Sequence, residues 1–100
     1  MDSNRLIWKE RALCDREAIR DFIAQDNPLA ALELDEQFEA QAELARRNPR
    51  LYKPGRRRGT RELVVRPNYV MVYLITKAAP GCVVEILRVL HAAQRWPPRA

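Results

Sequence analysis

Apolar side chains recur at helical spacing in two stretches of the first half of the chain. Between Arg11 and Gln25 they follow one another at three- and four-residue intervals; they are Cys14, Ala18, Ile19, Phe22 and Ile23. From about residue 28 to residue 47 they lie opposite a row of glutamates; they are Ala31, Leu34, Phe38, Ala42 and Ala45. Each spacing predicts a helix with one apolar face.

The residues between the two helices predict a sharp turn. Pro28 has no backbone N–H to donate and suits the first turn of a helix, which Asn27 can cap. Asn48-Pro49 ends the second helix. Because the link between the helices is so short, we expect an antiparallel helical hairpin.

The second half of the chain is rich in β-branched and aromatic residues. Three runs, at 61–66, 69–76 and 82–90, predict strands, and a shorter run at Arg5–Lys9 predicts another. The loops between the last three runs are too short for anything but neighbouring antiparallel strands. Tyr69–Ile75 is apolar on both faces, so we expect it at the centre of the sheet with cover on each side. The predicted fold is α+β, with the hairpin packed on a mainly antiparallel sheet in the order β-α-α-β-β-β.

The length and composition set the class of protein. One hundred residues form a single domain, 1–100, with a core from about residue 5 to residue 97. The 47% hydrophobic and 31% charged residues are typical of a folded chain. Neither a membrane-spanning run nor the apolar core of a signal peptide is present, so we expect a cytoplasmic protein with no membrane partner.

Charge is divided unevenly between the two halves. Residues 1–45 carry five basic and eleven acidic side chains, whereas residues 46–100 carry thirteen basic and two acidic ones. This asymmetry indicates a C-terminal surface for a polyanion or an acidic partner. Alternatively, the arginines serve only solubility, although Lys53, Arg56, Arg57 and Arg58 concentrate more charge than solubility needs.

Familiar cofactor and metal motifs are absent from the sequence. Two separated cysteines and one histidine cannot build a four-ligand zinc site, and the three glycines form no nucleotide-binding loop. We therefore expect neither a metal nor a cofactor. Cys14 with His91 could act as nucleophile and base, but Cys14 falls on the predicted apolar stripe, which favours a small buried thiol.

Polar groups at strand ends are the remaining candidates for chemistry. They are Arg61, Glu62, Arg66, Tyr69, Tyr73, Arg88, His91 and Gln94. Cleavage of RNA needs cations on the scissile phosphate and groups that move protons, which arginines with His91 or a tyrosine could supply. The structural alternatives are that Arg61 and Glu62 pair across the sheet and that His91 caps a strand end.

Two aromatic residues also have two interpretations. Trp96 is expected to fold back over the edge of the core, although it could also contact a partner. Tyr52 stands beside the basic run, where it could stack on a base or pack over the end of the hairpin.

The runs Gly59–Tyr73 and Val84–Pro97 resemble the ParE/RelE superfamily of toxins from type II toxin–antitoxin modules. Leu6–Trp8, Asn27–Ala31 and Asn48-Pro49 look like the same family, so the resemblance covers roughly residues 5–97. It implies two helices against an antiparallel sheet. It also implies a bacterial toxin neutralised by an acidic antitoxin from the same operon, with operator DNA bound only through the antitoxin.

The superfamily divides by target. RelE-like members cut messenger RNA in the ribosome and often read Tyr-Arg-Leu-Val-Tyr on the central strand, whereas ParE-like members poison DNA gyrase. Here residues 68–73 read Asn-Tyr-Val-Met-Val-Tyr, with Tyr69 where that arginine would stand, and this favours the ParE-like side.

The resemblance thus implies a gyrase poison that is not an enzyme; the alternatives are a ribosome-dependent mRNA endonuclease and an inert relative that binds only its antitoxin. A ribonuclease would use Arg61, Arg88, His91 and Tyr69. The residues expected to bind the target or the antitoxin are Lys53, Arg56, Arg57, Arg58, Arg61, Arg66, Arg88, Gln94 and Trp96.

Overall fold

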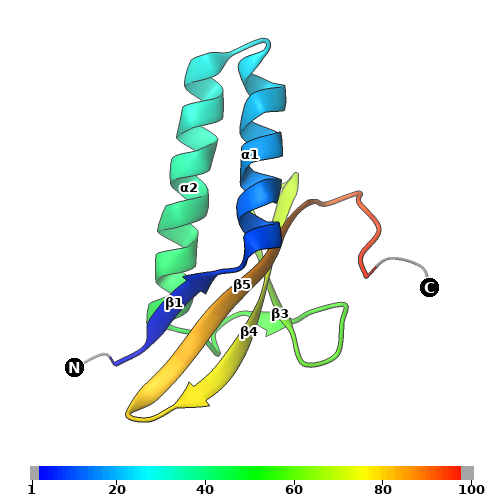
Figure 1. Ribbon diagram of the computed structural model, residues 1–100. Helices are drawn as coiled ribbons and strands as arrows, with labels where there is room; N and C mark the ends of the chain where they lie inside the picture. The colour runs from blue at the N-terminus through cyan, green and yellow to red at the C-terminus, as the bar shows by residue number, and fades with distance from the viewer. Residues whose placement is uncertain (1–2, 98–100) are drawn as a thin grey trace.

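A helical hairpin packed on one five-stranded sheet makes up the computed structural model, which describes residues 3–97 (Figure 1). The elements are β1 (Arg5–Trp8), α1 (Glu10–Ala24), α2 (Pro28–Arg47), β2 (Lys53–Pro54), β3 (Arg61–Val65), β4 (Tyr69–Ala78) and β5 (Gly81–His91). The strand order is β1-β5-β4-β3-β2; β1 runs parallel to β5, and the other neighbours are antiparallel. The predicted α+β fold is confirmed. The two-residue strand β2 lies outside the four runs predicted as strands.

The second helix follows its sequence pattern closely. The Asn27 side-chain oxygen accepts a hydrogen bond from the Ala30 N–H at 3.0 Å, and Pro28 occupies the first turn. All five residues of the predicted apolar stripe of α2 are buried. Leu34 and Phe38 join the main core against the sheet, so burial of this stripe fixes the hairpin on one face of the sheet.

The first helix departs from the prediction. Its buried residues are Ala12 and Arg16, with Ile19 and Ile23 half-buried, while Phe22 is 70% exposed. The expectation that Cys14 is a small buried thiol is wrong, because Cys14 is exposed. The inward face of α1 is rotated away from it to bury Arg16, a paired charge that an apolar pattern cannot reveal.

Cover on both sides of β4 is confirmed. Met71 and Tyr73 belong to the main core beneath the helices. Val72 alternates to the opposite face and is buried with Leu90 and Trp96, the latter 7% exposed. The expectation that Trp96 folds back over the core is therefore confirmed. Within the described residues, no helix is long and apolar enough to cross a membrane.

Candidate functional site

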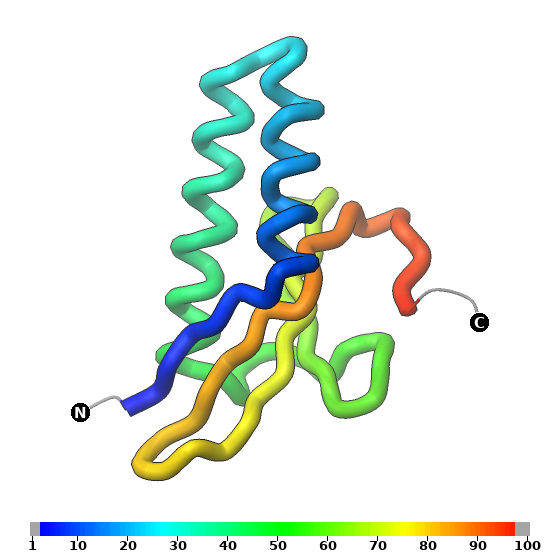
Figure 2. Tube along the Cα trace, viewed as in Figure 1, coloured from blue at the N-terminus to red at the C-terminus, as the bar shows by residue number. Residues whose placement is uncertain are grey.

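The connection between β2 and β3 and the segment after β5 form one basic surface. Both lie on the same side of the molecule in Figure 2. Arg56 donates from Nη1 to the Gln94 carbonyl oxygen at 3.2 Å, and the Arg57 guanidinium lies 6.0 Å from the centre of the Trp96 ring. We call this the loop–tail surface; its exposed members are Lys53, Arg56, Arg57, Arg58, Gln94 and Arg95.

A buried carboxylate shapes the loop of this surface. Glu62 is 5% exposed and accepts hydrogen bonds from the Arg56 backbone N–H at 2.7 Å and from Arg56 Nε at 3.2 Å. The Thr60 hydroxyl donates to the Arg57 carbonyl, and Gly59 takes a φ of 85°, which favours glycine. The side chain of Arg56 is thus used to hold the loop.

Three other cations of the loop–tail surface have no carboxylate partner among the described residues. Within residues 3–97, Lys53, Arg57 and Arg58 form no ion pair, and all three are exposed. An unneutralised basic loop held in shape by its own hydrogen bonds is suited to contact a polyanion or an acidic protein surface.

Arg61 has a structural role instead of the expected pairing with Glu62. From Nη1 it donates to the carbonyl oxygens of Tyr52 at 2.7 Å and of Arg50 at 3.4 Å, which holds the α2–β2 connection against β3. The suggested Arg61–Glu62 pair is wrong, because successive strand residues point to opposite faces and Glu62 binds Arg56. Tyr52 packs edge-on against Tyr73, with ring centres 6.5 Å apart, which favours the packing alternative for Tyr52.

A second group of candidates meets at a cleft of about 350 Å³ between α1 and the ends of β4 and β5. Tyr69 and His91 are register partners there, with ring centres 5.6 Å apart in an edge-on arrangement. His91 Nδ1 accepts a hydrogen bond from the Ala93 N–H at 3.2 Å, so the proton of a neutral ring is on Nε2. His91 therefore binds backbone just past the strand end, and Gln94 lines the same cleft.

Arg88, on the same strand, is neutralised by α1. Its Nε and Nη2 donate to the two carboxylate oxygens of Asp15 at 2.8 and 3.0 Å, and Asp15 also accepts from the Val89 N–H at 2.9 Å. The hydrogen bonds to Asp15 outweigh burial and raise the pKa of Arg88. This bidentate pair ties α1 to the part of β5 that β1 does not reach.

The four residues proposed for a ribonuclease are not gathered at one point. Tyr69 and His91 are adjacent, whereas Arg61 is the register partner of Tyr73. Tyr73 lies four positions further along β4 than Tyr69, or roughly 13 Å at the usual rise of a strand. Arg66 lies beyond the end of β3, where its Nε donates to Gln37 Oε1 at 2.8 Å.

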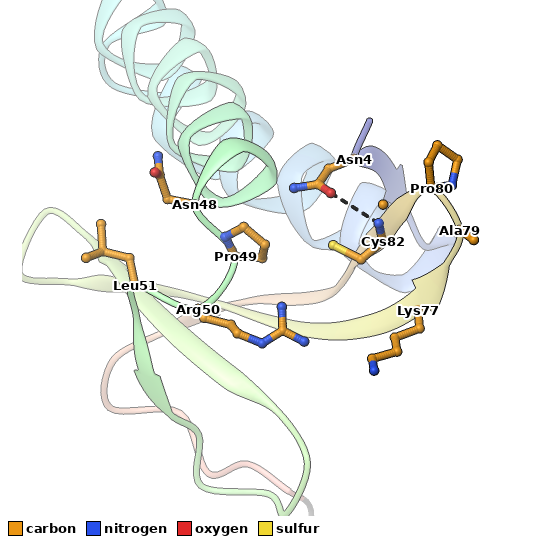
Figure 3. A pocket seen from close by; sticks show the side chains of 10 residues that line it. Asn4, Asn48, Pro49, Arg50, Leu51, Lys77, Ala79, Pro80 and Cys82 are labelled. Carbon is orange, nitrogen blue, oxygen red and sulfur yellow. Dashed lines mark hydrogen bonds between the residues drawn. The ribbon is translucent and has the colours of Figure 1, made fainter. Parts of the chain in front are cut away.

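One further site lies outside all the candidates predicted from the sequence, in a groove of about 740 Å³ between the α2–β2 connection and the β4–β5 turn (Figure 3). Three segments distant in the chain line it, and no local motif marks them. The one signal in the sequence is an apolar residue, Leu51, directly beside Arg50; in the structure Leu51 is 72% exposed. In the described part of the chain, no cluster of three potential ligands could hold a metal ion.

Comparison with known proteins gives consistent matches along nearly the whole chain. Residues 6–96 match the family described as ParE toxin of type II toxin-antitoxin system, parDE. Toxin Y4kP of Sinorhizobium fredii is 35% identical over 98 residues, which cover 97% of both proteins. Toxin RelE2 of Caulobacter vibrioides is 39% identical over 92 residues, which cover 90% of this chain and 97% of that protein.

Two solved structures share the fold. A chain of the chromosomal ParDE TA system from P. aeruginosa superposes with a TM-score of 0.77 at 21% identity, covering 91% of this chain and 98% of that one. The YoeB/ParE toxin from Agrobacterium tumefaciens gives a TM-score of 0.63 at 15% identity, with coverages of 87% and 97%. At these identities the likeness establishes the arrangement of helices and strands.

Proposed function

Because the chain belongs to the ParE toxin family of type II toxin–antitoxin systems, we propose that it inhibits growth by binding and poisoning DNA gyrase. In this proposal the toxin traps gyrase on DNA and cuts no nucleic acid itself. The loop–tail surface makes the contact through its unpaired cations Lys53, Arg57 and Arg58. A cognate antitoxin follows from the family; its acidic character and its origin in the same operon are part of the proposal.

The proposal rests on one observation: some arginines are held by hydrogen bonds within the protein, and others are not. Arg88 is held by Asp15 and Arg61 by backbone carbonyls, so neither is available to a scissile phosphate without breaking short hydrogen bonds. A ribonuclease of this kind needs free cations at the reacting phosphate. The loop–tail surface, by contrast, carries the unpaired cations Lys53, Arg57 and Arg58, which support recognition of a charged surface.

Purified gyrase and supercoiled plasmid test the proposal directly. Adding the toxin should convert plasmid into linear DNA that becomes visible after the gyrase is denatured and digested. Prior addition of the cognate antitoxin should abolish this linear product. If plasmid topology stays unchanged at toxin concentrations that stop growth, gyrase is not the target.

Cleavage of mRNA in the ribosome is a second candidate function, which two observations favour. One relative, at 39% identity, carries the name RelE2. In addition, Tyr69 and His91 meet at a cleft, and His91 is exposed with its Nε2 free of the backbone contact that Nδ1 makes.

Primer extension on abundant transcripts after toxin induction tests this second function. An endonuclease would produce new ends at defined codon positions, and His91→Ala would lower the cleavage rate by about 10²–10⁴-fold if His91 moves the proton. Growth arrest with intact transcripts would contradict it.

A further inference from the structure

We infer that the groove between the α2–β2 connection and the β4–β5 turn is the docking site for an extended acidic segment of the antitoxin. This inference rests on the proposed function in one respect, the acidic character of the antitoxin. It adds the place of binding and the residues that recognise the segment, which are Arg50, Leu51 and Lys77.

Both walls of the groove are held in place by partly buried hydrogen bonds. On one wall, the Asn4 side chain accepts from the Cys82 N–H at 3.1 Å and donates to the Arg46 carbonyl at 2.9 Å. On the other, the Tyr73 hydroxyl donates to the Pro49 carbonyl at 2.5 Å. A groove that exists before binding loses little conformational entropy when a ligand enters, which favours affinity.

The turn between β4 and β5 is packed too closely to move independently. A Cβ placed on Gly81 would lie 2.7 Å from both the Ser3 backbone and Asn4 Oδ1, a distance that requires a shift. The turn is therefore pressed against the segment that precedes β1, and the wall that carries Lys77 and Pro80 is fixed relative to the sheet.

The positive charge of the groove lining favours an acidic ligand. Arg50 reaches into the groove from the α2–β2 connection, while Lys77 lies on the side of β4 (Figure 3). Within residues 3–97 neither side chain forms an ion pair, and no carboxylate lines the groove. Two cations that face one concave space repel each other, and a carboxylate placed between them removes that repulsion.

The apolar part of the lining favours a peptide over a nucleic acid. Leu51 is exposed beside Pro49, and Pro80 and Cys82 line the opposite part. Such a surface matches an apolar side chain next to an acidic one on an extended peptide. A phosphate backbone would instead need a row of cations, which the lining does not offer.

Charge reversal on each wall tests the inference. The probe is the purified product of the reading frame that adjoins the toxin gene, and the measurement is its dissociation constant by titration calorimetry. Arg50→Glu and Lys77→Glu should each weaken binding by about ten- to a hundredfold, because a charge-assisted contact becomes a repulsive one. Leu51→Ala should weaken it by about tenfold through loss of apolar burial.

The matched control is Arg11→Glu, which makes the same charge change at an exposed position on α1, outside the groove lining. It should bind the antitoxin with at most a small change. Circular dichroism and thermal unfolding of every variant separate lost binding from lost folding. Because Arg50 and Lys77 are exposed, we expect all variants to fold.

Other outcomes overturn the inference in distinguishable ways. If Arg50→Glu and Lys77→Glu bind the antitoxin as tightly as Arg11→Glu does, the segment docks elsewhere. If they lose affinity only for a short DNA duplex, the groove binds nucleic acid. If the wild-type toxin neither inhibits growth nor binds the adjoining product, the proposed function itself fails.

Discussion

The junction between the hairpin and the sheet and the loop–tail surface use the same residue type in opposite ways. At the junction, Arg16 donates to both Asp35 and Glu39 and lies 4.5 Å over the Trp8 ring. Burial by itself would lower the pKa of Arg16, but the hydrogen bonds to Asp35 and Glu39 outweigh it and raise that pKa. On the loop–tail surface, Arg57 and Arg58 face no described carboxylate.

A count of charges therefore does not locate a binding surface. Arg16 and Arg88 hold elements of the fold together, because each lies within hydrogen-bond distance of a carboxylate on another element. On the loop–tail surface, Lys53 and Arg58 have no such partner within residues 3–97, so their charges are left for recognition. We therefore expect substitutions in the two regions to separate into effects on stability and effects on activity.

Asp35→Ala should have the largest effect on stability. It leaves Arg16, 8% exposed, with Glu39 as its remaining partner, and an incompletely compensated buried charge costs about 3 kcal/mol. The measurement is the free energy of unfolding in urea. Glu36→Ala, an exposed neighbour on α2, is the control and should change it by less than about 0.5 kcal/mol. If both variants lowered the free energy of unfolding equally, the pairing of Arg16 with Asp35 would not be what stabilises the fold.

Asp15→Asn should have the second largest effect on stability. It should lower the free energy of unfolding by about 2 kcal/mol, because the hydrogen bonds from Arg88 and Val89 lose their charged acceptor. Asp21→Asn, exposed on the same helix, is the control. The double variant Asp15→Asn with Arg88→Gln should recover part of the loss, since no charge is then left alone. A strictly additive loss in this double-mutant cycle would show that the pair is not coupled.

Tyr73→Phe should lower the free energy of unfolding by about 1 kcal/mol, because it removes the hydrogen bond to the Pro49 carbonyl. Burial raises the pKa of Tyr73 to about 12, above the value of about 10 expected when the chain is unfolded. The associated stability is thus fully present below pH ~10 and is lost as the pH rises toward ~12. Urea unfolding across this range should show a steeper decline for wild type than for the variant, and identical slopes would contradict it.

Lys53→Ala combined with Arg58→Ala should have the smallest effect on stability, within about 0.5 kcal/mol, because neither side chain has a described ion-pair partner. Growth inhibition on induction should nevertheless fall sharply. A variant that is as stable and as toxic as wild type would place the functional surface elsewhere.

Elements that are positioned by the burial of apolar side chains could be predicted from the sequence. The five-residue stripe of α2, the central position of β4 and the return of Trp96 over the sheet all follow from where apolar side chains stand. The parallel pairing of β1 with β5 could not be predicted, because it depends on backbone hydrogen bonds between distant segments. The strand β2 could not be predicted because two residues are too few to show an alternating pattern.

Polar interactions explain what the pattern missed at the candidate site. The α1 face was misassigned because Arg16 is buried with its partners, which lie on a different helix. Arg88 and Asp15 are 73 positions apart in the sequence, so no local pattern indicates that they pair. By contrast, Tyr69 and His91 were both recognised as candidates at strand ends, and the sheet register brings them together.

We propose that unpaired cations of the loop–tail surface carry the activity, whereas arginines paired with carboxylates carry the fold. The most direct measurement compares gyrase-dependent plasmid linearisation by two double variants at equal concentrations of folded protein. We predict that Asp15→Asn with Arg88→Gln linearises plasmid as wild type does, and that Lys53→Ala with Arg58→Ala does not. The reverse result, with activity lost in the Asp15→Asn, Arg88→Gln variant and kept in the Lys53→Ala, Arg58→Ala variant, would show that the loop–tail cations do not carry the activity.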